Sequence, residues 1–144
     1  MFSIIVVNIW RGVPFFAISL LAGLQTISPD LNEAAAIDGA TPRAQFWRIT
    51  VPHLSPIIFF NLVVGVIGAF QEFDRAYVVT TGANYGPGDS LLTPVYYLFA
   101  NGFSYFKMGY ASAIAWVIFS VVLLLTLVQL RVAKRWVHYE GERE

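Results

Sequence analysis

The stretch that decides the fold is residues 108–130, MGYASAIAWVIFSVVLLLTLVQL, which contains no Asp, Glu, Lys or Arg. An α-helix of this length extends about 35 Å, and the hydrocarbon core of a bilayer is about 30 Å thick. Its centre, residues 114–125, reads IAWVIFSVVLLL and has almost no polar side chain. The stretch therefore predicts a helix that crosses a membrane.

Two further stretches have a similar length and character. One covers about residues 4–27, with Arg11 as its only charge, and the other covers about residues 54–74, of which 54–71 is uncharged. Over the whole chain 57% of residues are apolar and 12% are charged, roughly half the charged share of a soluble domain. We therefore predict an all-α, polytopic membrane protein with about three transmembrane spans.

A fourth uncharged stretch, residues 90–106, is not predicted to cross the membrane. It contains Pro94, Asn101 and Gly102, which weaken a continuous apolar helix. Its Tyr and Phe side chains suit a helix at the membrane interface or facing outward.

The charges of the loops predict the orientation. Three spans place the 28–53 loop and the C-terminal tail on one side of the membrane and the 75–107 loop on the other. The first side has six Lys and Arg residues and the second side has two, and cytoplasmic loops carry the excess of such residues. They are Arg43, Arg48, Arg131, Lys134, Arg135 and Arg143 against Arg75 and Lys107. The N-terminus then faces outward without a basic anchor, so we expect residues before Met1 to be missing.

The 28–53 loop carries the signals of a helix, a glycine turn and a second helix. Ser28-Pro29-Asp30 is typical of a helix start, and the spacing of Asp30 and Glu33 resembles a capping box in which Asp replaces Ser or Thr. Residues 34–36 are alanines, which favour a helix with a small-residue surface. Gly39 can adopt the left-handed conformation that closes such a helix.

The second helix of the loop is predicted to start at Thr41 as N-cap, with Pro42 at its first position. Pro52 is predicted to end it, and Ser55-Pro56 to open the second span. Capped surface helices between spans are common, so this architecture alone also fits a loop without a special role.

The residue pattern of the loop resembles the EAA motif of ABC importer permeases. That pattern is EAA, three residues, Gly, nine residues and Ile-x-Leu-Pro. Here residues 33–35 are EAA, Gly39 follows after three residues, and residues 49–52, ITVP, follow after nine more. Val51 in place of Leu is a mild apolar exchange.

The resemblance extends along the chain to the carbohydrate-uptake branch of the family. Residues 8–15, NIWRGVPF, look like its fourth helix, residues 70–74, FQEFD, like the end of its fifth, and residues 109–113, GYASA, like the start of its sixth. Residues 82–87, GANYGP, depart from the usual run of glycines before proline. Family members usually have six helices, so the chain resembles the C-terminal half of a permease.

The resemblance implies a multi-pass protein of the bacterial inner membrane. Two permease subunits would form the pathway, two cytoplasmic ATPase subunits would drive it, and a periplasmic binding protein would deliver a sugar or polyol. The loop would dock on the ATPase, with the alanines allowing close approach and Glu33 offering a carboxylate to a basic group. Glu33 could also act only as a first-turn carboxylate favoured by the helix dipole, and Asp38 could brace the turn or pair with the partner. The implied coupling residues are Glu33, Ala34, Ala35, Asp38 and Gly39.

Polar or small residues in and beside the second span are candidates for the translocation pathway, because polar groups are costly in lipid. Asn61 could instead hydrogen-bond a neighbouring helix, and Gly68, three residues after Gly65, could allow close helix packing. Gln71 and Glu72 correspond to the part of the fifth helix that contributes to the sugar site in related permeases. They could also simply mark the exit of the span into water.

Nothing in the sequence indicates catalysis, a cofactor or a metal site. The P-loop pattern is absent, so ATP hydrolysis is expected on a separate subunit. There is no cysteine, and His53 and His138 stand without metal-ligand spacing. Net charge is zero, which gives no footprint for nucleic acid.

An intramembrane enzyme would need paired acidic or His residues within the spans. A truncated, transport-incompetent permease fragment and an unrelated small membrane scaffold remain as alternatives.

Overall fold

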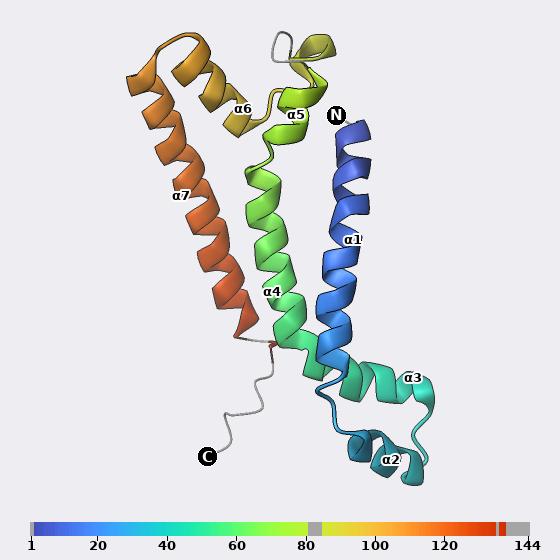
Figure 1. The fold of residues 1–144 in the computed structure, drawn as a ribbon. Helices are drawn as coiled ribbons and strands as arrows, with labels where there is room; N and C mark the ends of the chain where they lie inside the picture. The colour runs from blue at the N-terminus through green and yellow to red at the C-terminus, as the bar shows by residue number, and fades with distance from the viewer. Residues whose placement is uncertain (1, 81–84, 135, 138–144) are drawn as a thin grey trace. The chain divides into compact units, whose positions relative to one another are not determined.

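The computed structural model describes residues 2–80, 85–134, 136 and 137, and every regular element in these ranges is a helix (Figure 1). Within these described ranges, three helices are long and apolar enough to cross a membrane. They are α1 (Phe2–Leu24), α4 (Val51–Phe70), which belongs to a longer helical run from Pro42 to Val79, and α7 (Met108–Ala133). The predicted all-α class and the three apolar spans are confirmed.

The remaining elements are short and connect the long helices. They are α2 (Pro29–Ile37), α3 (Pro42–Gln45), the π-helix η1 (Phe46–Thr50), α5 (Asp74–Val79), the 3-10 helix η2 (Pro87–Asp89), α6 (Pro94–Phe99) and the π-helix η3 (Ala100–Ser104). Residues 90–106 thus form α6 and η3 and no long helix. Residues 82–84, Arg135, His138 and Arg143, which entered the predictions for the outer loop and the tail, lie outside the described residues.

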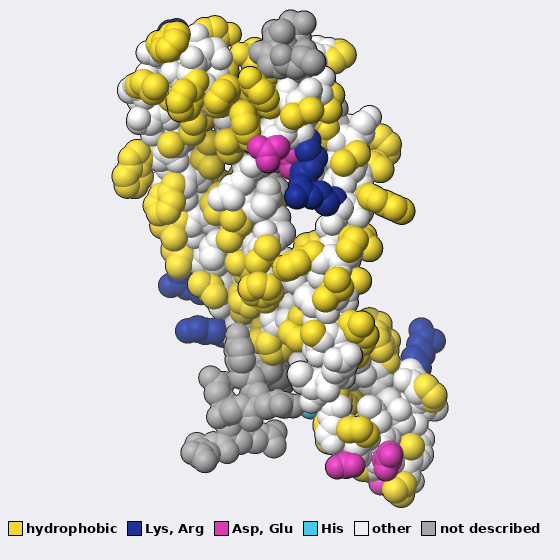
Figure 2. Space-filling model, in the orientation of Figure 1, with side chains coloured by type: hydrophobic (Ala, Val, Ile, Leu, Met, Phe, Trp, Pro, Cys, Tyr) yellow, Lys and Arg dark blue, Asp and Glu magenta, His cyan; other side chains and the backbone are white. Residues whose placement is uncertain are grey.

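The long helices expose apolar side chains over much of their surface, as Figure 2 shows. Trp10 on α1 is 82% exposed and Trp116 on α7 is 68% exposed. An apolar surface of this extent would be unfavourable in water. It suits helices whose surroundings are lipid or further apolar helices.

The chain divides into two compact units. Unit 1 comprises residues 2–10 and 64–128, and unit 2 comprises residues 11–63 together with the described residues from Gln129 to Val137. The core of unit 1 is formed by Ile4, Ala76, Leu91 and Tyr96. It therefore joins the start of α1 to the elements that follow α4.

The predicted end of the helix at Pro52 is wrong, because α3, η1 and α4 follow one another without a break. Proline has no N–H and its ring clashes with the carbonyl four residues earlier. Here the helix widens to a π-helical turn just before Pro52, and the Val51 N–H bonds to the Phe46 carbonyl. Turns of this kind and prolines are the usual causes of bent, continuous helices.

Pro56 lies one turn further along and removes a second backbone donor. Its missing N–H would leave the Pro52 carbonyl without a partner. The Ser55 hydroxyl donates to that carbonyl at 2.6 Å, and Ser55 is 2% exposed. Ser55 therefore supplies the hydrogen bond that Pro56 cannot, which is one way that membrane helices tolerate proline.

Candidate functional site

The start of α2 differs from the predicted capping box. Ser28 is the N-cap, and its hydroxyl oxygen accepts a hydrogen bond from the Asp30 N–H at 3.3 Å. Pro29 occupies the first position of the helix, which agrees with the predicted helix start at residues 28–30. Asp30 is therefore not the cap but a residue of the first turn. In the first turn its carboxylate is favoured by the helix dipole.

Gly39 closes α2 in the left-handed conformation, with φ = +76°, as predicted. The Gly39 N–H bonds to the Ala36 carbonyl at 3.0 Å, and the Ala40 N–H bonds to the Ala35 carbonyl at 2.9 Å. These two bonds define a Schellman motif, which satisfies the last carbonyls of a helix.

The turn after Gly39 leads directly into α3. The Thr41 hydroxyl oxygen accepts a hydrogen bond from the Ala44 N–H at 3.3 Å, which makes Thr41 the N-cap as predicted. The Gln45 side chain also donates to the Ala40 carbonyl at 3.2 Å. Helix, glycine turn and helix are thus held in one defined path.

The candidate coupling residues form an exposed surface. No residue of α2 is buried, and Glu33, Ala34, Asp38 and Gly39 are exposed, while Ala35 is half-buried. The helix and its cap carry acidic groups and no Lys or Arg, and Figure 2 shows acidic side chains over α2. α2 therefore exposes acidic and small side chains together with the apolar side chains of Leu31 and Ile37, and makes little use of its own chain for packing.

Asn61 lies on α4 and is paired with Ser19 on α1 within unit 2. The Asn61 amide nitrogen donates to the Ser19 hydroxyl oxygen at 2.7 Å, and the Asn61 side-chain oxygen lies 3.1 Å from that hydroxyl. Asn61 is 8% exposed. The structure thus supports the interpretation that Asn61 hydrogen-bonds a neighbouring helix.

Gly23 is a packing position that the sequence analysis missed. A Cβ at Gly23 would lie 2.1 Å from Ile57 Cδ1 and 2.8 Å from Leu54 Cδ2, well inside van der Waals contact. The side chains of α4 therefore occupy the space that a side chain at Gly23 of α1 would fill. A Cβ at Gly68, in contrast, would meet nothing within 4 Å, so Gly68 does not serve helix packing among the described residues.

Gln71 and Glu72 follow directly after α4 but differ in their surroundings. Gln71 is exposed in the turn that ends the helix. The Glu72 side chain is 12% exposed, and its Oε1 atom is buried without a hydrogen-bond partner among the described residues. The interpretation that both residues mark an exit into water fits Gln71 but not Glu72.

Arg75 and Asn8 complete a polar cluster around Glu72 that the sequence analysis did not assemble. The Arg75 guanidinium donates to Glu72 Oε2 and to Asn8 Oδ1. The Thr93 hydroxyl donates to the Glu72 backbone carbonyl at 2.5 Å. The cluster joins the start of α1 to the turn between α4 and α5. The spacing of three residues between Glu72 and Arg75 could have indicated this ion pair from the sequence. The hydrogen bond between Arg75 and Asn8 depends on tertiary structure.

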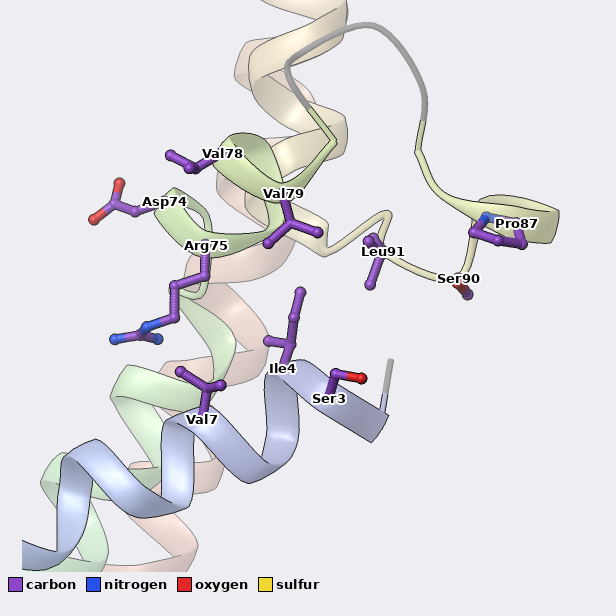
Figure 3. Close-up of a pocket in the computed structure, with 10 residues that line it drawn as sticks. All are labelled: Ser3, Ile4, Val7, Asp74, Arg75, Val78, Val79, Pro87, Ser90 and Leu91. Carbon is purple, nitrogen blue, oxygen red and sulfur yellow. The ribbon is translucent and has the colours of Figure 1, made fainter.

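A cavity of about 530 Å³ lies beside Arg75 in unit 1. Figure 3 shows the Arg75 side chain extending from α5 toward α1, beside Val7. The lining residues are Ser3, Ile4, Val7, Asp74, Arg75, Val78, Val79, Pro87, Ser90 and Leu91. Most of these side chains are apolar, and few polar groups converge as the binding of a sugar would require.

Aromatic side chains pack around the core of unit 1. Phe73 and Phe99 have ring centroids 4.9 Å apart, and Tyr85 and Tyr96 have centroids 5.1 Å apart. The hydrogen bond between the Tyr85 and Tyr105 hydroxyls, at 3.2 Å, raises the pKa of Tyr85 to about 12. Among the described residues, no three His, Asp or Glu side chains could hold a metal ion.

The chain is similar to proteins whose names describe them as transporter permeases. It is 44% identical over 144 residues to the "Probable ABC transporter permease protein YesP" of Bacillus subtilis, covering 100% of this chain and 46% of that protein. It is 38% identical over 133 residues to the arabinooligosaccharides transport system permease protein AraP of the same organism, covering 92% and 42%. The trehalose/maltose transport system permease protein MalF of Thermococcus litoralis is 40% identical over 133 residues, covering 92% and 44%.

The chain spans less than half the length of each of these three relatives. A family model described as "binding-protein-dependent transport system inner membrane component" matches residues 1–138. This match covers all three long helices and does not favour the unrelated scaffold. The chain therefore belongs to the family of binding-protein-dependent transport system inner membrane components, which are multi-pass membrane proteins.

Proposed function

We propose that the chain is the C-terminal half of a permease subunit in an ATP-driven importer. The permease passes a sugar or a related solute from a periplasmic binding protein across the inner membrane. Support comes from the family match and from relatives whose names state transport of arabinooligosaccharides and of trehalose or maltose. A second permease subunit pairs with this one, and ATP is hydrolysed on separate cytoplasmic subunits.

The observation that carries the coupling role is the geometry of α2, Gly39 and α3. An exposed helix of small and acidic residues ends in a fixed glycine turn, and α3 continues through η1 into the apolar helix α4. A partner that moves α2 therefore moves the start of α4. We assign ATPase coupling to Glu33, Ala34, Ala35, Asp38 and Gly39.

The translocation pathway is proposed to pass along α4 and the turn that follows it. Gly68 and Gln71 are exposed there, and Glu72 has one carboxylate oxygen without a protein partner among the described residues. Asn61 is proposed as a pathway residue whose amide also bonds to Ser19. The proposed set is Asn61, Gly68, Gln71 and Glu72.

Replacing Glu33 with alanine tests the coupling role in the complete importer. We expect less ATPase to co-purify with Glu33→Ala and solute uptake to fall, because a carboxylate facing a basic partner is removed. Asp30→Ala is the matched control, since Asp30 is an acidic residue of the same helix outside the motif, and it should leave both measurements near normal. Equal behaviour of the two variants would assign Glu33 only a helix-dipole role.

Cysteine labelling tests the orientation that the coupling role requires. Single cysteines at Thr41 and at Ser90 are treated with a membrane-impermeant thiol reagent in intact cells. The six-to-two distribution of basic residues leads us to expect labelling at position 90 and none at position 41 until the cells are opened. Labelling of position 41 from outside would contradict the proposed orientation.

A further inference from the structure

The α3–η1 segment, residues 42–50, presents aromatic and basic side chains that contact little of the described chain. Phe46 is 49% exposed and Trp47 is 62% exposed, and their rings meet edge to face with centroids 5.3 Å apart. Arg43 and Arg48 are also exposed. Arg43, Phe46 and Trp47 are spaced three and four residues apart, so they share one face of the helix.

The α3–η1 segment immediately precedes the apolar helix α4 in the chain. It runs directly into α4, and Figure 1 shows that it lies across the direction of α4. α4 has 20 residues and is about 30 Å long, which matches the hydrocarbon core. Trp47 precedes Val51 by four residues, or about 6 Å along a helix, and the headgroup layer on each side is about 5–7 Å thick.

We propose that the α3–η1 segment is an interfacial anchor that binds the lipid headgroup layer. Trp47 and Phe46 lie at the boundary between headgroups and acyl chains, where aromatic rings are favoured. Arg43 and Arg48 donate charge-assisted hydrogen bonds to lipid phosphates. A helix with one aromatic face and flanking basic side chains is the type that lies in the plane of the interface.

Within the loop, the α3–η1 segment and α2 carry charges of opposite sign. The α3–η1 segment carries two Arg and no acidic residue, whereas α2 and its cap carry Asp30, Glu33 and Asp38 and no Lys or Arg. Anionic headgroups attract the first segment and repel the second. The anchor therefore fixes the height of Gly39 above the bilayer while α2 stays free for a protein partner. This inference needs only the membrane location and does not depend on the coupling role.

The first test uses the fluorescence of Trp47 in the full chain. Trp10, Trp116 and Trp136 are replaced by Phe, and the protein is reconstituted in phosphatidylcholine vesicles containing lipid brominated either near the ester group or near the chain end. We expect stronger quenching of Trp47 by the bromine near the ester. The matched control retains only Trp116, eight residues into α7, and should show the opposite preference.

Quenching of Trp47 by aqueous iodide, with no quenching by either brominated lipid, would overturn the proposal. A preference of Trp47 for the deep bromine would also overturn it, because the segment would then lie in the hydrocarbon core.

The second test measures what the two arginines contribute to lipid binding and whether the ATPase competes with lipid for the same surface. Adding phosphatidylglycerol to the vesicles should shift Trp47 emission to shorter wavelength, and the double variant Arg43→Gln/Arg48→Gln should lose this shift. Purified ATPase subunit should leave the quenching by brominated lipid unchanged. If the ATPase abolishes that quenching, or if the double variant keeps the full shift, the surface is not a lipid anchor.

Discussion

Replacing Gly39 with valine is expected to abolish solute uptake by the complete importer while the permease still inserts into the membrane. Gly39 has φ = +76°, and a Cβ there would meet nothing within 4 Å. The cost therefore comes from the backbone and not from a clash. It is roughly 1–2 kcal/mol for an ordinary L-residue and more for a β-branched one. Relief of that strain breaks the two Schellman bonds and changes the direction in which α3 leaves the turn.

Gly39→Asn is the matched control, because asparagine adopts the left-handed conformation more readily than other residues with a side chain. We expect this variant to keep most of the uptake and most of the co-purified ATPase. Both variants should be recovered from the membrane in normal amounts. Equal loss in the valine and asparagine variants would indicate that the side chain blocks a partner, and full uptake with valine would contradict a coupling role for the turn.

Replacing Arg75 with leucine is expected to destabilise unit 1 strongly. The change removes the guanidinium that pairs with Glu72 and leaves a carboxylate that is only 12% exposed. Breaking a buried ion pair costs about 3–5 kcal/mol, and partial exposure of Arg75 lowers this value. The measurement is thermal unfolding of the detergent-solubilised protein, followed by the loss of its helical circular dichroism signal.

The double variant Arg75→Leu/Glu72→Gln provides the control, because it removes the unpaired charge as well. We expect it to recover much of the stability that Arg75→Leu loses, and no recovery would contradict the buried-carboxylate explanation. Glu72→Gln alone separates structure from transport. Normal unfolding with altered uptake or solute preference supports a pathway role, whereas normal unfolding and normal uptake leave Glu72 with a structural role only.

The sequence predicts the local structure of this protein well. The length of the uncharged stretches predicts three spans, because the hydrocarbon core sets a minimum length that few other structures require. The left-handed Gly39 and the Thr41 N-cap follow from preferences that depend on a few neighbouring residues. The helix start at residues 28–30 was predicted in position, but the capping oxygen belongs to Ser28, since Pro29 fills the first helical position and places Asp30 within the turn.

Features that depend on a distant partner could not be predicted in the same way. The alternative that Asn61 hydrogen-bonds a neighbouring helix did not name that helix, because Ser19 lies 42 positions away in the sequence. The same holds for Arg75 with Asn8 and for the close approach at Gly23. The error at Pro52 has a local cause, because the propensity of proline to end a helix was offset by the π-helical turn that precedes it. Such a turn is not evident from residue preferences alone.

The pairing of Ser19 with Asn61 bears on the order in which the protein is made. The partners belong to α1 and α4, which both precede α7, so their hydrogen bonds can form before the ribosome has completed α7. An amide that leaves the insertion channel with its partner avoids exposure to acyl chains as a single unpaired group. α1 and α4 are thus suited to leave the channel together, and α7, which is the most apolar of the three long helices described, can enter the lipid by itself.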